Sequence, residues 1–326
     1  MPALAEHSIH LLSTRAGTNV VCECIAYGTV KDRKKIIKCF KGYTRNALLQ
    51  RDAYLAIMRM CDVMDDTVLV NKMLLAELHS NPDSKGVEDD NDDGEEKPSP
   101  ILDLVMSNTG SKLFLLLLVS KEEESSTPSD KATPRWQKYL DPYELSVLHR
   151  NPTLTENGEE VATSKKEDET RRRELVTYLK ELLIEVCVKH TEEMMTSRPG
   201  SRVLMEVCES FPSEEVFRAI VEACAKGEAA EPLPMLEHPI GHLTLKHIFL
   251  SESKKEVDKD DPSLARLFYS EFGNKLGDIA SSNRGAFVLS ALIQTCVKEE
   301  VKRELKMSRC LERGLAGQLA LSKYLD

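Results

Sequence analysis

A glycine followed by an apolar helical segment recurs along this chain and constrains its fold more than any other feature. Residues 282–293 read SNRGAFVLSALI, in which Gly285 precedes Val288, Leu289 and Leu292. The pattern is also anchored on Gly17, Gly110, Gly200 and Gly241, and on Asp52 in a degenerate copy. Successive anchors lie 35, 58, 90, 41 and 44 residues apart, and each of the two long steps contains an insertion. Self-similarity at such spacing predicts a repeat protein.

The pattern has a physical reason in helix packing. A residue without a Cβ atom allows two helices to approach closely, so we expect each unit to end one helix, turn, and begin another at the glycine. Val203, Leu204 and Val207 follow Gly200 by three, four and seven residues and therefore share one helix face. A single unit cannot bury that face. Stacked units would share one continuous aliphatic core.

Shifts in composition divide the chain. Residues 79–100 are acidic and rich in Gly, Pro and Ser, which is typical of a segment that stays disordered. The predicted organisation is two repeats at 1–78, an acidic disordered loop at 79–100, a third repeat helix at 101–120, a polar insertion at 121–170 with a short helix near 136–149, and C-terminal repeats at 171–326.

The net charge of −10 is spread unevenly, so it does not exclude nucleic acid as a ligand. Residues 1–78 carry eleven Lys and Arg against eight Asp and Glu, whereas 79–100 carry two against eight. In the predicted helix at 31–43, Lys34, Lys38, Lys41 and Arg45 fall on one face. That face is either an ordinary solvated surface or a stripe that contacts phosphates. A second basic cluster, residues 171–173, opens a predicted helix at 171–190, where cations are unfavourable, so it is either a hint of an external anion or a cluster that solvation alone tolerates.

Cysteine and histidine patterns argue against a metal site. The nine cysteines form no C-x-x-C pair and lie mostly in apolar helical runs, which predicts buried thiols in a reducing compartment. His238, His242 and His247 lie close in sequence, but Pro239 and Gly241 interrupt them, so a repeat loop is favoured over a metal site. No catalytic or nucleotide-binding motif occurs, and residues 113–119, the longest apolar run, are too few to cross a bilayer. We therefore expect a soluble intracellular monomer without enzyme activity, cofactor, metal or membrane association.

Several stretches together resemble one known family. They are residues 28–43 (GTVKDRKKIIKCFKGY), 65–67 (DDT), 170–175 (TRRREL), 237–246 (EHPIGHLTLK) and 282–289 (SNRGAFVL). In this order they are similar to the divergent Puf-A branch of the Pumilio/PUF repeat family, with its C-terminal CPL region. The resemblance implies an all-α, right-handed superhelical solenoid of three-helix repeats with long disordered insertions. Relative to that family, the sequence begins inside the repeat array at Met1.

The resemblance also implies roles for the residues that follow each anchor. In PUF repeats the second residue stacks on a base, and the first and fifth contact the base edge, where the fifth is usually Gln or Glu. The three positions here are Thr18, Asn19 and Cys22; Ala53, Tyr54 and Ile57; Ser111, Lys112 and Leu115; Ser201, Arg202 and Met205; His242, Leu243 and Lys246; and Ala286, Phe287 and Ser290. No fifth residue is Gln or Glu, which predicts that the one-base-per-repeat code is largely absent.

Binding to RNA backbone and shape would then remain. The candidate RNA-binding residues are Asn19, Lys31, Arg33, Lys34, Lys35, Lys38, Lys41, Tyr54, Lys112, Arg202, His242, Lys246, Arg284 and Phe287. The Puf-A resemblance further implies a nucleolar or nuclear scaffold in large ribosomal subunit (pre-60S) biogenesis and rRNA processing, with pre-rRNA, ribosomal proteins or assembly factors as partners. The alternative is a protein-binding solenoid of the HEAT or armadillo kind that makes no direct RNA contact, which the acidic charge favours.

Overall fold

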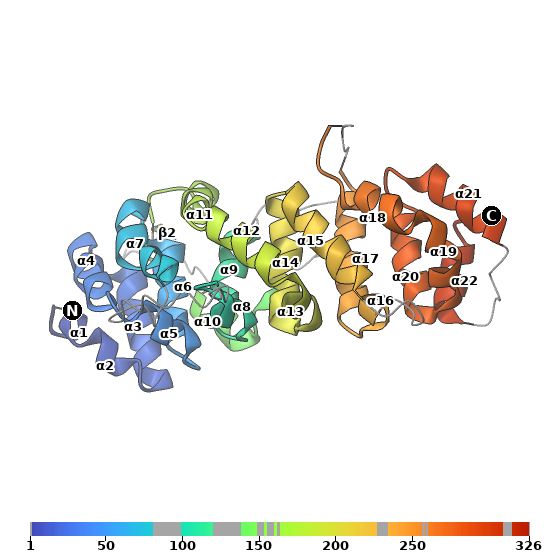
Figure 1. The fold of residues 1–326 in the computed structure, drawn as a ribbon. Helices are drawn as coiled ribbons and strands as arrows, with labels where there is room; N and C mark the ends of the chain where they lie inside the picture. The colour runs from blue at the N-terminus through green and yellow to red at the C-terminus, as the bar shows by residue number, and fades with distance from the viewer. Residues whose placement is uncertain are drawn as a thin grey trace, which may run out of the picture. The chain divides into compact units, whose positions relative to one another are not determined.

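The chain forms two compact helical units that divide between Leu182 and Leu183. The computed structural model describes residues 2–80, 99–119, 138–148, 153–154, 160–161, 164–226, 234–255, 258, 260–308 and 315–325. Most of the acidic segment predicted at 79–100 lies outside this described part, as do residues 120–137 of the polar insertion. Figure 1 shows the helices of each unit.

Fourteen elements lie in the described part of the first unit. They are α1 (Pro2–Glu6), α2 (Ser8–Leu11), α3 (Arg15–Tyr27), α4 (Val30–Cys39), α5 (Thr44–Leu49), α6 (Tyr54–Val63), α7 (Thr67–Met73), the 3-10 helix η1 (Leu75–His79), α8 (Leu102–Met106), α9 (Ser111–Leu118), α10 (Pro142–Leu148), the two-residue strands β1 (Thr153–Leu154) and β2 (Glu160–Val161), and α11 (Asp168–Thr177). β1 and β2 pair antiparallel, with Thr153 opposite Val161.

The described part of the second unit is helical. The division between the units falls within α12 (Lys180–Lys189). The following elements are α13 (Thr191–Thr196), α14 (Arg198–Ser210), α15 (Glu214–Ala225), α16 (Pro234–Glu237), α17 (Gly241–Glu252), α18 (Leu264–Phe272), the 3-10 helix η4 (Gly273–Lys275), α19 (Leu276–Ser281), α20 (Asn283–Leu292), α21 (Lys298–Ser308) and α22 (Ala316–Ser322).

Each predicted copy forms a short helix followed by a longer one. The pairs are α2 and α3, α5 and α6, α8 and α9, α13 and α14, α16 and α17, and α19 and α20. A third helix follows in each copy, namely α4, α7, α11, α15, α18 and α21. In the first unit α6 packs between α3 and α9, and in the second α17 packs between α14 and α20 (Figure 1). The predicted all-α fold of three-helix repeats is confirmed, with the short β1–β2 ladder as its exception.

The repeat glycine is the third residue of the second helix in α3, α14 and α20, whereas α17 begins at Gly241 and Gly110 immediately precedes α9. In α3 the side chain of Thr14 caps the helix and accepts a hydrogen bond from the Gly17 amide at 3.1 Å. Ser282 accepts in the same way from the Gly285 amide at 3.0 Å. Ser107, Ser197 and His238 make the equivalent bond to Gly110, Gly200 and Gly241. A capping side chain three residues before each glycine therefore begins the helix and satisfies an amide that would otherwise lack a partner.

Close contact with the preceding short helix explains the glycine. A Cβ atom on Gly110 would lie 2.7 Å from the carbonyl oxygen of Leu104, and one on Gly241 would lie 2.6 Å from that of Met235. Added Cβ atoms on Gly17 and Gly285 would overlap the carbonyl oxygens of residues 11 and 279. In all four copies this carbonyl oxygen belongs to the residue six positions before the glycine. Alanine would therefore push the two helices of the repeat apart.

The long helix predicted at 171–190 from apolar spacing is interrupted. The expected helix at 171–190 is α11 and α12, separated by a tight turn in which the Tyr178 and Leu179 amides bond to carbonyls three residues earlier. This turn keeps Leu175, Leu179 and Leu183 buried, so the apolar spacing does not reveal it. α11 packs on α6, α7 and α9 and so lies in the first unit, whereas the sequence placed it with the C-terminal repeats.

Most of the described cysteines lie in the aliphatic core. Cys22, Cys24, Cys61, Cys187, Cys208 and Cys224 are buried, Cys39 is half-buried and Cys296 is exposed. Burial raises the pKa of the Cys61 and Cys224 thiols to about 12. These thiols stay neutral in the fold but ionise at their ordinary pKa when unfolded, so their contribution to stability falls as pH rises through that range.

Thiol labelling of the native protein is expected to separate these groups. Cys296 should react with an alkylating reagent, whereas Cys61 and Cys224 should stay unmodified because the reactive thiolate is suppressed and access is blocked. Peptide mass spectrometry after timed labelling measures this, with denatured protein as the control in which all three react. Modification of Cys61 at the rate of Cys296 under native conditions would contradict it.

Candidate nucleic-acid interface

The residues expected to contact base edges are mostly buried inside the repeats. Thr18, Cys22, Ile57 and Leu115 are at most 2 % exposed. Ala53, Ser111, Ser201, Ala286 and Ser290 are also buried, and Met205, His242 and Lys246 are half-buried. Buried side chains of this kind cannot form hydrogen bonds with a base edge. The tertiary structure therefore agrees with the absence of a one-base-per-repeat code.

The residues at the expected stacking position of the first three copies lie under α10. We call Asn19, Tyr54 and Lys112, carried by the adjacent helices α3, α6 and α9, the N-terminal row. The Asn19 side-chain oxygen accepts a hydrogen bond from the Tyr143 hydroxyl at 2.7 Å. The Glu144 carboxylate accepts from the Tyr54 hydroxyl and forms an ion pair with the Lys112 ammonium group. Burial, followed by this carboxylate, raises the pKa of Tyr54.

Local sequence shapes α10 for this contact. The Asp141 and Glu144 side chains each accept the other residue's backbone N–H, at 2.8 and 2.7 Å. Such a reciprocal cap, with Pro142 at the first helical position, starts a helix efficiently. It places Tyr143 and Glu144 together in the first turn.

The predicted basic stripe near α4 is only partly formed. α4 ends at Cys39, and Gly42 follows with a positive φ of 83°, so Lys41 and Arg45 do not continue its face. Arg45 pairs instead with the Asp103 carboxylate and the Pro100 carbonyl. The ammonium groups of Lys34 and Lys35 lie 3.4 and 3.5 Å from carboxylates of residues 66 and 6. The side chains of Lys31, Lys38 and Lys41 are exposed.

Arg33 faces the protein interior from the same helix. Its guanidinium donates to the carbonyl oxygens of Ala26 at 2.5 Å and Val63 at 3.2 Å. These carbonyls lie at the C-terminal ends of α3 and α6, where a cation is favourable. Burial lowers the pKa of Arg33. Arg33 therefore joins two repeats, and the sequence pattern did not separate it from its exposed neighbours.

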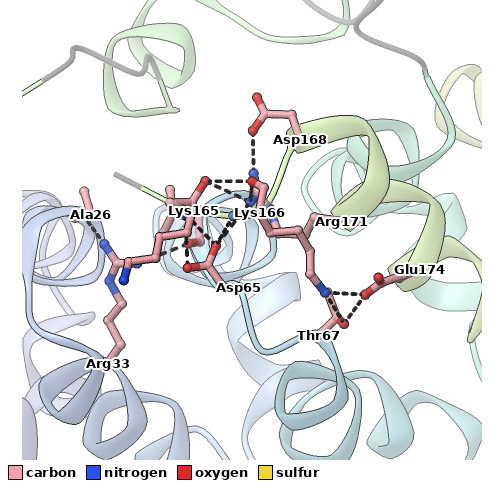
Figure 2. Close-up of polar contacts among 11 residues, drawn as sticks. Ala26, Arg33, Asp65, Thr67, Lys165, Lys166, Asp168, Arg171 and Glu174 are labelled. Atoms are coloured by element: carbon pink, nitrogen blue, oxygen red, sulfur yellow. Dashed lines mark hydrogen bonds and ion pairs between the residues drawn. The ribbon is translucent and has the colours of Figure 1, made fainter. Parts of the chain in front are cut away.

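In the Arg171–Arg173 cluster, Arg171 and Arg172 are engaged within the protein and Arg173 is exposed, which argues against the expected external anion. Figure 2 shows Asp65 accepting the backbone amides of Lys165 and Lys166, at 3.0 and 2.9 Å. The Arg171 guanidinium, whose side chain is 1 % exposed, lies 2.7 Å from the Asp168 carboxylate and 3.9 Å from that of Asp65. It also donates to the Ser164 hydroxyl and the Lys166 carbonyl.

The contacts of Arg172 and Lys166 are also made within the first unit. Arg172 pairs with Glu169 and donates to the Leu117 and Leu118 carbonyls at the end of α9. The Lys166 ammonium group lies 2.6 Å from Glu174, and hydrogen bonds from Lys166 and then Thr67 lower the pKa of that carboxyl group. These contacts attach α11 to α7 and α9 after the long insertion. They have a structural role, and sequence reasoning missed their acidic partners.

In the second unit the expected stacking residues are Arg202 on α14, Leu243 on α17 and Phe287 on α20. We call Arg202 and Phe287, together with the expected edge residues His242 and Lys246 of α17, the C-terminal row. Arg202 is exposed, and the Lys246 ammonium group lies 5.2 Å from the centre of the Phe287 ring, within range of a cation–π contact. The half-buried Arg284 donates to the Glu237 carbonyl. Cations and an aromatic ring are therefore combined on neighbouring repeats.

The histidines near α17 serve the backbone. A ring nitrogen of His238 accepts from the Ile240 and Gly241 amides, both at 3.2 Å, and a ring nitrogen of His242 lies 2.7 Å from the His238 carbonyl oxygen. Within the described ranges, no group of three or more His, Cys, Asp or Glu side chains is placed to hold a metal ion. The helices that the structure describes also lack the length and apolar character to cross a membrane.

A cavity of about 350 Å³ lies in the second unit and is separate from the C-terminal row. Met205, Cys208, Phe217 and Ile248 form apolar parts of its wall, and Glu252 is one of its polar residues. The Glu252 carboxylate accepts hydrogen bonds from Ser263 and the Ala265 amide, and burial raises its pKa. No candidate RNA-binding residue lines this cavity.

Comparison with known proteins relates the chain to one group. A family model described as the CPL (NUC119) domain matches residues 133–261. Pumilio homolog 3 of Mus musculus is 28% identical over 310 residues, covering 92% of this chain and 41% of that protein. Pumilio homolog 3 of Danio rerio is 28% identical over 316 residues, covering 94% and 44%. The chain thus spans less than half the length of these relatives.

Solved structures of Puf proteins are also similar to this chain. Human Puf-A in complex with DNA matches with a TM-score of 0.75 and 28% identity, covering 98% of this chain and 56% of that one. The Puf4 RNA-binding domain, bound to the HO endonuclease RNA 3′ UTR recognition sequence, matches with a TM-score of 0.58 at 9% identity, covering 98% and 76%, and so supports the fold alone. The six three-helix copies, the CPL match and the likeness to human Puf-A support one conclusion: this chain is similar to Puf-A and is built of divergent PUF-like repeats.

Proposed function

We propose that this chain is an RNA-binding repeat scaffold that contacts RNA backbone and shape without a one-base-per-repeat code. The observation that carries the proposal is the contrast between buried edge positions and the cationic and aromatic residues beside them. Human Puf-A has been solved with DNA, which supports a nucleic acid as the ligand. Cations neutralise phosphates, and aromatic rings stack on any base.

Reversing two charges in the C-terminal row tests the proposal. The variant Arg202→Glu/Lys246→Glu is expected to lower affinity for a labelled oligouridylate by roughly tenfold to a hundredfold, and to reduce the log–log salt slope by about two, because two phosphate contacts are replaced by repulsion. Fluorescence anisotropy at several salt concentrations measures both quantities.

The control carries the same charge change elsewhere in the unit. Lys275→Glu/Arg303→Glu alters exposed residues of η4 and α21, outside the C-terminal row, and should retain most of the affinity. Equal loss in both variants would assign the binding to net charge and reject the row as the site. Absence of binding by the unmodified chain at low salt would reject RNA as the ligand.

The finer assignment rests on the Puf-A resemblance. We propose pre-rRNA as the RNA, large ribosomal subunit biogenesis and rRNA processing as the setting, ribosomal proteins or assembly factors as further partners, and the nucleolus or nucleus as the location. Crosslinking in cells, followed by sequencing of the attached RNA, tests the RNA identity. Recovery dominated by mRNA in place of pre-rRNA would contradict it.

A protein-binding scaffold is the second candidate function, favoured by a specific observation. The N-terminal row is occupied by a peptide segment of the chain itself, α10, so this surface is able to bind protein. Affinity capture before and after nuclease treatment separates the two functions. Partners that survive complete RNA removal support the protein-binding function, whereas partners lost with the RNA support the RNA scaffold.

A further inference from the structure

The surface beneath α10 has the chemistry of a nucleic-acid site. Besides the N-terminal row, it includes Arg15 and Arg59, whose guanidinium groups contact α10. Three cations, an amide and a tyrosine are therefore gathered on α3, α6 and α9, which pack side by side. Exposed together, these groups would attract phosphates and stack on bases.

α10 presents to this surface the groups that a nucleotide would present. The flat ring of Tyr143 lies against the Arg15 guanidinium, whose carbon is 3.4 Å from the ring centre, as a base would. The Glu144 carboxylate, 1 % exposed, pairs with Lys112 as a phosphate would. At the end of α10, the Leu148 carbonyl accepts from Arg59 at 3.0 Å.

From these contacts we propose that α10 is an internal competitor of RNA, which occupies the N-terminal row until RNA displaces it. The inference rests on the proposed RNA-binding function and concerns the regulation of that site. In the docked state the N-terminal row is closed, and the C-terminal row makes the first RNA contacts.

The energetics permit displacement. A seven-residue helix is unstable alone in water, so α10 owes its order to docking and would unfold when it leaves. The docked state also leaves a buried hydrogen-bond donor unused, because the Nε of Arg59 has no hydrogen-bond partner among the described residues. RNA would supply charge partners to Arg15 and Lys112, offsetting the loss of the Glu144 and Tyr143 contacts, whereas Arg59 keeps its ion pair with Asp62 at 3.5 Å.

Removing the two contacting side chains tests the inference on the full chain. Tyr143→Ala/Glu144→Ala is expected to raise affinity for a labelled oligouridylate by about tenfold, because RNA no longer has to displace docked α10. The gain should persist when Arg202→Glu/Lys246→Glu is added, since it arises in the first unit. The control Ser146→Lys makes the same +1 charge change at an exposed position of α10 and should show a smaller gain.

A second measurement needs no substitution. Hydrogen–deuterium exchange of the α10 amides should increase when the unmodified chain is saturated with the same oligouridylate. If the unmodified chain binds RNA but the double variant gains no more than Ser146→Lys, or if α10 stays protected in the complex, the competitor role is overturned while the RNA-binding function stands. If no chain binds RNA, including the variant with α10 released, both the function and the competitor role are rejected.

Discussion

Replacing Arg171 with methionine is expected to destabilise the first unit by roughly 3–5 kcal/mol, the range for breaking a buried ion pair. The Arg171 guanidinium is buried and holds Asp168, the Ser164 hydroxyl and the Lys166 carbonyl. Methionine fills similar space but leaves these acceptors without their donor. Because they connect α11 to residues 164–166 just before it, the loss should open this part of the unit first.

The control for Arg171→Met lies two residues away. Arg173→Met makes the same substitution in α11, but the Arg173 side chain is 66 % exposed and its contact to Glu169 is 3.8 Å long, so the expected change is within about 1 kcal/mol. Denaturant unfolding followed by circular dichroism gives the free energies, and hydrogen exchange at 164–177 locates the effect because the two units need not unfold together. Equal stability of the two variants would show that the Arg171 contacts contribute little.

Alanine at Gly285 is expected to lower the free energy of unfolding of the second unit by roughly 2–3 kcal/mol, near the upper end of the range for overpacking. The added methyl group would overlap the Ile279 carbonyl oxygen, which is backbone and cannot rotate away. The only relief is to separate α19 from α20, which would also strain the Ser282 cap on the Gly285 amide.

Gly273→Ala is the matched control for Gly285→Ala. Gly273 is also in the second unit and in the helical region of φ and ψ, but a Cβ there meets nothing closer than 3.4 Å. Alanine at this site should leave stability nearly unchanged or raise it by about 0.4–1 kcal/mol, because it restricts the unfolded chain. Thermal and denaturant unfolding measure both variants. A stability of Gly285→Ala equal to that of Gly273→Ala would reject close helix contact as the reason for the repeat glycine.

The cap that accompanies each glycine was visible in the sequence although it was not used. Thr14, Ser107, Ser197, His238 and Ser282 each stand three residues before an anchor. Four of these are residues favoured at helix N-caps, so the helix start could have been placed correctly. Because cap and glycine are both local signals, they survive even where the rest of the repeat diverges.

The candidate interface was less predictable. Arg33 and Lys34 are adjacent in a basic run, yet Arg33 turns inward to two backbone carbonyls while Lys34 stays exposed. Which residue turns inward depends on the ends of α3 and α6, brought together by packing. The predicted external anion at Arg171–Arg173 was wrong because Arg171 and Arg172 pair with Asp168 and Glu169 of the same helix and donate to backbone carbonyls of residues 166, 117 and 118.

The sequence by itself determined the repeat architecture of this protein, because glycine spacing and helical apolar periodicity act within a single repeat. It also indicated that the one-base-per-repeat code is largely absent, since no fifth position carries Gln or Glu. Only the tertiary structure decided which candidate residues are accessible. Glu144 meets Tyr54 across 90 residues of chain, and Tyr143 meets Asn19 across 124. No local pattern encodes such pairing, because it depends on how α10, a helix within the 121–170 insertion, docks on the stack of α3, α6 and α9.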